Sequence, residues 1–192
     1  MHLMHDSGQE LFEELTSQAE AGEGEDEDER LNKLFSNILR GANELTSEIG
    51  FVAEQMAPCF PPYWAIETIW TTCVAHLCSS QILTQIGGPE GEKLPHLQVT
   101  QLLDLVAWVE NFREIIEESF PDVVGNISSE RTYFDEKPNL LTANNTTVDI
   151  SKARDSLAWV NNILWDAHDL AKVEFLFRTT EQTEDWLDKV YK

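Results

Sequence analysis

The sequence predicts an all-α protein in which long antiparallel helices stack into an elongated bundle, preceded by a disordered acidic stretch. Apolar residues recur at steps of three and four over several long segments, which is the period of a helix with one buried face. No segment alternates apolar and polar residues as a half-buried β-strand does. Proline, glycine and asparagine separate the periodic segments, and these residues favour turns and helix ends.

Residues 1–30 combine a short helical signal with an acidic run. The signal over residues 1–19 comes from Leu3, Leu11, Phe12 and Leu15. A helix of this length is too short to be stable alone. Seven of the ten residues from Glu20 to Glu29 are acidic, and the others are alanine or glycine. Because like charges repel and nothing apolar offsets the entropy of ordering, we expect a disordered linker, with a tether for a basic partner as the alternative.

Residues 31–121 form the predicted bundle segment, and their first helix has the clearest pattern. Its stripe is nearly heptad and consists of Leu31, Leu34, Phe35, Ile38, Ala42, Leu45, Ile49, Val52 and Met56. Such a stripe requires partner helices. Gly41 and Gly50 weaken this helix without ending it.

Two further helices follow in the same segment. The second runs from Ile66 to Ile86, where glycines and then a proline end it. The third runs from about Gln98 to Phe120 and is stopped by Pro121. One of its faces is lined by Leu102, Val106, Val109, Ile116 and Phe120.

A stiff corner separates the first two helices of this segment. Its predicted structural residues are Pro58, Cys59, Phe60, Pro61 and Pro62. Each proline fixes its own φ and disfavours the helical region for the residue before it. Phe60, Tyr63 and Trp64 give the corner aromatic surface to pack.

The rest of the chain divides into a connection and a final helical segment. Residues 122–148 show no long periodicity, so we expect a loop-rich connection. Residues 149–192 are helical again, with a stripe of Ala153, Leu157, Val160, Leu164, Ala167 and Ala171. The pair Thr179-Thr180 marks a place where this helix could bend or break.

Composition excludes several classes of function. The chain has a formal net charge of -22 and an isoelectric point near 4.3. Binding to nucleic acid or to anionic lipid requires lysine and arginine in excess. We find no apolar run long enough to span a membrane and no apolar signal-peptide region. Three cysteines among apolar residues suit the reduced thiols of a cytoplasmic protein.

Candidate metal ligands and catalytic groups are few. Cys73 and His76 can share a helix face, but Cys78 points elsewhere and no second ligand pair follows. The Glu-x-x-His pattern of helical di-iron sites is absent. His168 lies near two aspartates without a nucleophile or an oxyanion site. We therefore predict no catalytic residue, no metal and no cofactor.

Tryptophans are the strongest candidates for packing or for contact with a partner. The chain has six, and five are predicted as packing or interface anchors: Trp64, Trp70, Trp108, Trp159 and Trp165. Each is expected in a core, and any that stays exposed would anchor an interface.

The corner also carries a family resemblance. The stretch Phe51-Val52-Ala53-Glu54-Gln55-Met56-Ala57-Pro58-Cys59-Phe60-Pro61-Pro62-Tyr63-Trp64-Ala65-Ile66 resembles the exocyst complex component 3 family, in which a Pro-Cys-Phe-Pro-Pro sequence joins two helices. Downstream, Leu102-Leu103-Asp104-Leu105-Val106-Ala107-Trp108-Val109 is similar to the next helix of that family. The resemblance covers about residues 31–121.

The resemblance implies a rod of stacked helical bundles without enzyme activity. Such a subunit packs lengthwise, often as a coiled coil, against other exocyst subunits, especially exocyst complex component 4, with SNARE proteins as further candidate partners. It would be cytoplasmic, and recruited to plasma-membrane sites where secretory vesicles are tethered before fusion. Two alternatives remain: an acidic helical module that binds basic proteins through residues 20–30, and a metal-dependent helical-bundle enzyme.

Overall fold

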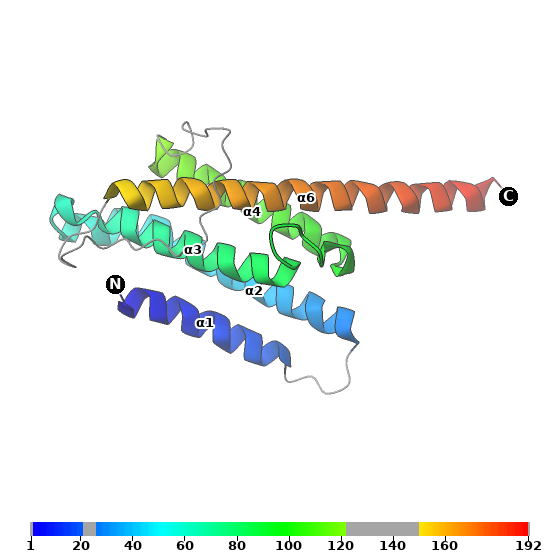
Figure 1. Ribbon diagram of the computed structural model, residues 1–192, viewed down its shortest axis with the longest axis horizontal. Helices are drawn as coiled ribbons and strands as arrows, with labels where there is room; N and C mark the ends of the chain where they lie inside the picture. The colour runs from blue at the N-terminus through cyan, green and yellow to red at the C-terminus, as the bar shows by residue number, and fades with distance from the viewer. Residues whose placement is uncertain (1, 21–25, 122–149, 192) are drawn as a thin grey trace.

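The computed structural model describes residues 2–20, 26–121 and 150–191. The predicted loop-rich connection and the centre of the acidic run, residues 21–25, lie outside this part. Within it the all-α class is confirmed, since five α-helices and no strand are present. The helices are α1 (His2–Glu20), α2 (Glu27–Phe51), α3 (Ile66–Ile86), α4 (Val99–Ser119) and α6 (Ile150–Val190). Successive helices run in opposite directions along the long axis (Figure 1).

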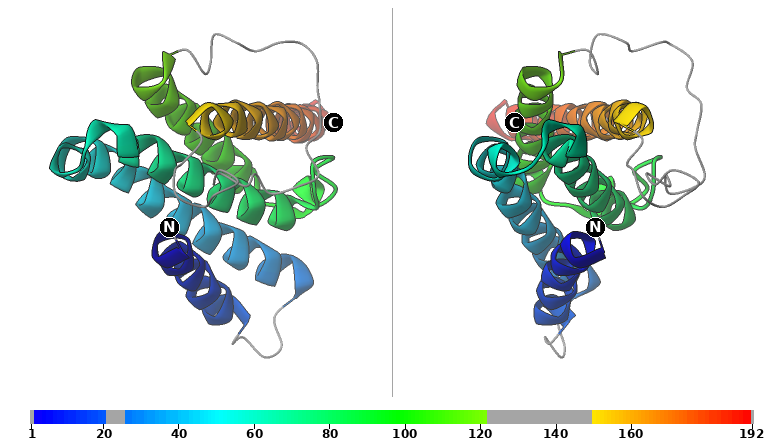
Figure 2. Two further views of the ribbon diagram at one scale, coloured as in Figure 1. Left: turned by 60° about the vertical axis from the view of Figure 1, so that its left-hand side comes forward. Right: turned by 90° about the vertical axis from the view of Figure 1, so that its left-hand side faces the viewer.

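The helices enclose one cluster of buried apolar side chains. The helix α6 packs against α3 and α4, and α2 packs against α1, α3 and α4. Figure 2 shows α6 above α2 and α3, with α1 on the far side of the bundle. The largest fully buried side chains include Phe12, Phe35, Leu102, Phe112 and Leu157, which come from four different helices. All of the predicted segments with described residues therefore contribute to this cluster.

The short helix α1 is held by packing against the rest of the bundle. Its Phe12 and Leu15 are buried. Gly41 of α2 allows this close approach, because a Cβ atom there would lie 2.7 Å from Cδ1 of Leu15. The sequence indicated a helix too short to stand alone, and tertiary contacts supply the missing stability.

The helix that the sequence predicted to open at Leu31 begins earlier, at Glu27 within the acidic run. Glu27, Asp28 and Glu29 form the first turn of α2. The positive end of the helix dipole stabilises acidic side chains in a first turn. This interaction offsets part of the repulsion among them, so the helix begins within the acidic run.

Among the other helix boundaries, those of α3 agree with the prediction and the end of α2 does not. The range of α3 agrees with the prediction, and Gly87 at its end has φ 86°, which is left-handed. The helix predicted over residues 31–56 ends earlier, because α2 stops at Phe51 and a π-helical turn, Val52–Met56, continues to the corner.

The helix α6 shows no break at Thr179-Thr180. It is continuous from Ile150 to Val190, and its predicted stripe is buried. The Thr179 hydroxyl donates to the Phe175 carbonyl at 2.9 Å, and the Thr180 hydroxyl donates to the Leu176 carbonyl at 2.8 Å. These threonines satisfy their hydroxyl groups within the helix, so they do not interrupt it.

Candidate interaction surfaces

The cysteine and histidine pattern of α3 does not converge on a metal site. No group of three or more potential metal-binding side chains occurs among residues 2–20, 26–121 and 150–191. Cys78 is buried in the core, and desolvation raises the pKa of its thiol. The ring of His76 contacts the Ser156 hydroxyl and stacks on Trp159, with centroids 5.8 Å apart. Cys78 is therefore a packing residue of the core, and His76 joins α3 to α6.

His168 belongs to a polar cluster that joins α4 to α6. Its Nε2 lies 3.2 Å from Oε1 of Glu110, and its Nδ1 lies 2.9 Å from Oδ1 of Asp169. Lys172 donates to the same Glu110 oxygen at 2.9 Å. Hydrogen bonds from Lys172 and then from His168 lower the pKa of Glu110. Glu110 of α4 is thus engaged by two side chains of α6, and the cluster holds the two helices together.

The corner forms an exposed aromatic cap between α2 and α3. Ala57–Cys59 and Pro62–Trp64 are two short 3₁₀ turns. Phe60 stacks on Trp64 with centroids 5.6 Å apart, while Tyr63 meets the same ring edge-on at 6.5 Å. Tyr63 is 77% exposed and Trp64 is 46% exposed. The predicted corner residues lie together, and their aromatic rings pack mainly on one another.

The five predicted tryptophan anchors divide into packing residues and one exposed ring. Trp108 is buried and stacks on Phe112, with centroids 5.3 Å apart. Trp70, Trp159 and Trp165 are half-buried against the core. Only Trp64 among the five belongs to the exposed residues, so it is the anchor that fits the interface interpretation.

The carboxyl-terminal end of α6 is an extended exposed surface among the described residues. This end projects beyond the other helices (Figure 1), and every side chain of residues 181–191 is exposed. Exposed apolar side chains continue along it, and we call five of them the outer face of α6: Val173, Leu176, Phe177, Leu187 and Tyr191. At 3.6 residues per turn they fall within a sector about 100° wide, roughly opposite the stripe that faces the bundle. The helix therefore has two apolar faces, and one of them has no cover among the described residues.

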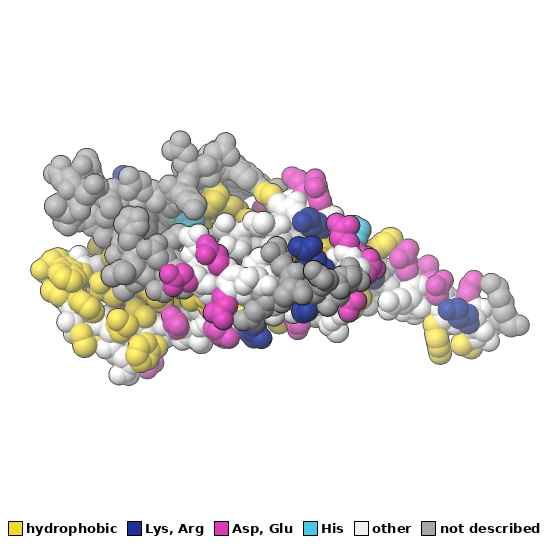
Figure 3. All heavy atoms as spheres, turned by 90° about the horizontal axis from the view of Figure 1, so that it is seen from below, with side chains coloured by type: hydrophobic (Ala, Val, Ile, Leu, Met, Phe, Trp, Pro, Cys, Tyr) yellow, Lys and Arg dark blue, Asp and Glu magenta, His cyan; other side chains and the backbone are white. Residues whose placement is uncertain are grey.

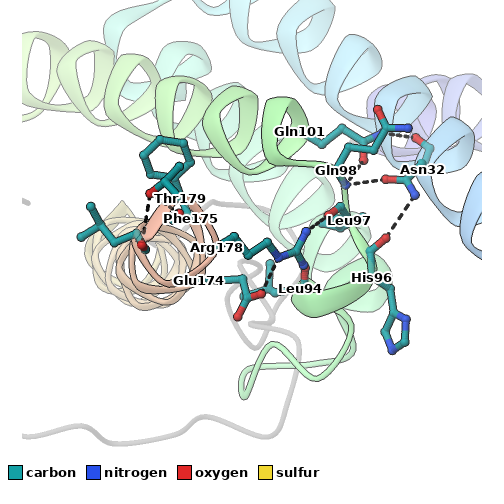
Figure 4. Close-up of polar contacts among 11 residues, drawn as sticks. Asn32, Leu94, His96, Leu97, Gln98, Gln101, Glu174, Phe175, Arg178 and Thr179 are labelled. Atoms are coloured by element: carbon teal, nitrogen blue, oxygen red, sulfur yellow. Dashed lines mark hydrogen bonds and ion pairs between the residues drawn. The ribbon is translucent and has the colours of Figure 1, made fainter. Parts of the chain in front are cut away.

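Polar contacts fix α6 on the bundle just before it projects (Figure 4). The Arg178 guanidinium donates to the carbonyl oxygens of Leu94 and Leu97 in the turn before α4, the first at 2.9 Å. Its Nε donates to the Glu174 carboxylate at 2.6 Å. Beyond Thr179 the helix has only exposed side chains.

The same turn is fixed to α2 by a second set of hydrogen bonds. Asn32 accepts from the Gln98 backbone N–H at 2.7 Å and donates to the His96 carbonyl at 3.1 Å (Figure 4). Gln101 donates to the Asn32 carbonyl and to the Ser36 hydroxyl. The turn that accepts the hydrogen bonds of Arg178 is thus itself hydrogen-bonded to α2.

Acidic side chains border the outer face of α6. Glu174, Glu181 and Asp188 recur at intervals of seven residues along one edge of this face, and Glu184 lies within it. Figure 3 shows acidic and hydrophobic side chains side by side along the projecting end. It also shows hydrophobic side chains gathered at the opposite end of the molecule, where the corner lies.

Sequence reasoning found the stripe of α6 that faces the bundle and missed its outer face. The available signal was the apolar group Val173, Leu176 and Phe177, which departs from the register of Ala167 and Ala171. The contribution of Arg178 had no sequence signal, because its acceptors are backbone carbonyls about eighty residues away.

Comparisons with protein-family models, with curated proteins and with solved structures found no match for this chain. None of the described helices combines the length and apolar character that crossing a membrane requires.

Proposed function

We propose that this chain is a non-catalytic scaffold subunit of the exocyst type that binds its partners through helix-to-helix packing. In this role it would help to tether secretory vesicles at the plasma membrane before SNARE-mediated fusion. The observation that carries the proposal is the outer face of α6, which projects past the bundle with large apolar side chains exposed to solvent. Exposed apolar surface of this kind marks sites of protein association.

The resemblance to exocyst complex component 3 supplies the identity of the expected partners. It rests on the corner and on the leucine-rich run that ends in Trp108-Val109. The corner joins α2 to α3, and the leucine-rich run lies in α4, so both fall in the helical context that the resemblance implies. Other exocyst subunits, especially exocyst complex component 4, are therefore the proposed partners, with SNARE proteins as further candidates.

A capture experiment with matched variants tests this function. Tagged wild-type chain is incubated with lysate of the source cells at moderate and high salt, and bound proteins are identified by mass spectrometry. We expect exocyst subunits at both salts, because apolar helix packing resists screening. The variant Leu176→Gln/Phe177→Gln should lose them, whereas Leu103→Gln, at an exposed leucine of α4, should retain them. Absence of exocyst subunits from every sample would refute the proposal.

The second candidate is an acidic helical module that binds basic proteins. It is favoured by the exposure of Asp26, Glu27, Asp28 and Glu29 at the start of α2. In this case the captured proteins would be basic and lost at high salt. Neutralising the acidic residues of the run would abolish binding, and the outer-face variant would leave it unchanged.

A further inference from the structure

We propose that the outer face of α6 binds an amphipathic helix whose apolar stripe is flanked along one side by lysine or arginine. The inference rests on the proposed scaffold function, and it specifies the chemistry of the partner. It excludes a second copy of this chain as the occupant.

The spacing of the outer face fits a helical partner. From Val173 the positions 177, 180, 184, 187 and 191 follow at alternating steps of four and three, and Leu176 lies beside them. This alternation is the a/d repeat of a two-stranded coiled coil. Residues 173–191 form a seam about 27 Å long, at 1.5 Å per residue. A partner helix of three heptads would cover it.

The charges beside the seam specify the sign of the partner. Four acidic side chains and one basic side chain lie between Thr179 and Tyr191. Glu181 and Asp188 occupy the same edge, where flanking residues of a coiled coil meet the opposite helix. The other edge carries Leu176, Thr183 and Val190, none of which is charged. Cations are therefore required along one side of the partner helix.

A second copy of the chain fits this surface poorly. In a parallel pair Glu184 would lie opposite its own copy within the seam, and like charges there are destabilising. In either orientation both helices would bring an excess of acidic groups into contact. The net charge of -22 on each chain adds long-range repulsion. A basic partner helix removes both penalties.

Designed peptides provide the test with the full chain. Three labelled peptides share one heptad leucine seam and differ only in their flanking residues, which are lysine, glutamine or glutamate. Binding is measured by fluorescence anisotropy at low and moderate salt. We expect the lysine peptide to bind about five- to tenfold more tightly than the glutamine peptide at low salt, since two or three exposed ion pairs contribute about that factor. The difference should shrink at moderate salt.

Substitutions locate the binding on α6. The change Glu181→Lys should remove the preference for the lysine peptide, while Asp185→Lys, on the side of the helix away from the seam, should preserve it. Phe177→Gln should weaken all peptides, because it removes apolar contact without altering charge. Circular dichroism should show an unchanged fold for each variant, since these side chains are exposed.

Three outcomes would overturn the inference. Equal binding of the lysine and glutamine peptides removes the charge preference and leaves the scaffold function standing. Undiminished binding after Phe177→Gln shows that the peptides bind elsewhere on the acidic surface. Dimerisation in analytical ultracentrifugation that Phe177→Gln abolishes makes a second copy the occupant. Loss of exocyst capture with intact preference for the lysine peptide would instead refute the proposed function alone.

Discussion

Replacing Arg178 with alanine is expected to lower the free energy of unfolding by about 2 to 3 kcal/mol. The guanidinium donates to two backbone carbonyls, those of Leu94 and Leu97, and its side chain is only 19% exposed. A hydrogen bond from a charged donor contributes about 1.5 to 3 kcal/mol. Water can reach the two carbonyls once the side chain is truncated. We therefore count roughly half of the summed contribution of the two hydrogen bonds. The partly exposed pair with Glu174 adds at most about 0.5 kcal/mol.

Urea unfolding followed by far-ultraviolet circular dichroism measures this loss. Arg178→Lys retains the charge but cannot reach both carbonyls in the same planar geometry, so it should lose about half as much. Glu174→Gln keeps the carbonyl bonds and should cost less than about 0.5 kcal/mol. Hydrogen exchange adds a local measurement, because the amides of residues 171–178 should exchange faster in Arg178→Ala.

A loss below about 0.5 kcal/mol for Arg178→Ala, with unchanged exchange in α6, would refute this reasoning. It would mean that water satisfies the two carbonyls equally well and that the buried stripe alone holds α6. An equal loss for Arg178→Lys and Arg178→Ala would indicate that geometry, with no contribution from charge, decides the interaction.

Three further predictions concern the rest of the bundle. Gly41→Ala should destabilise the protein by about 1 kcal/mol, because the new Cβ would meet Leu15 of α1. Gly50→Ala, with open space around it, should stabilise the protein by about 0.5 to 1 kcal/mol. Thermal unfolding of the two variants measures both effects. Replacing Pro61 and Pro62 with alanine should cost about 1 kcal/mol, since it increases the freedom of the unfolded corner, and an unchanged melting temperature would contradict this. The lowered pKa of Glu110 gives stability that is present above the ordinary glutamate value and is lost as pH falls through the folded value. Glu110→Gln should therefore flatten the acid limb of a plot of unfolding free energy against pH.

The parts of the fold that depend on local chemistry were predictable from the sequence. Gly87 ends α3 because the left-handed region is open to glycine, and the prolines of the corner end the preceding helix for equally local reasons. The docking of α1 was not predictable, because it depends on Gly41 meeting two side chains more than twenty residues away. The start of α2 was mispredicted because repulsion among acidic residues was weighed without their attraction to the helix dipole.

The outer face of α6 illustrates a different limit. Apolar periodicity shows that a helix has an apolar face, but it cannot decide which of two opposite faces the bundle covers. That choice depends on how α6 packs against α3 and α4, which is a property of the assembled fold.

The position of Arg178 separates folding from binding in this molecule. The buried stripe of α6 faces the bundle and ends at Ala171, about two turns before Arg178, while the outer face points away from the bundle and continues to Tyr191. A partner on the outer face would therefore not displace α3 or α4. It follows that outer-face substitutions should reduce binding at nearly constant stability, whereas Arg178→Ala should reduce stability and weaken binding only through increased motion of the projecting helix. Outer-face substitutions that unfold the protein would show instead that this face is part of the core.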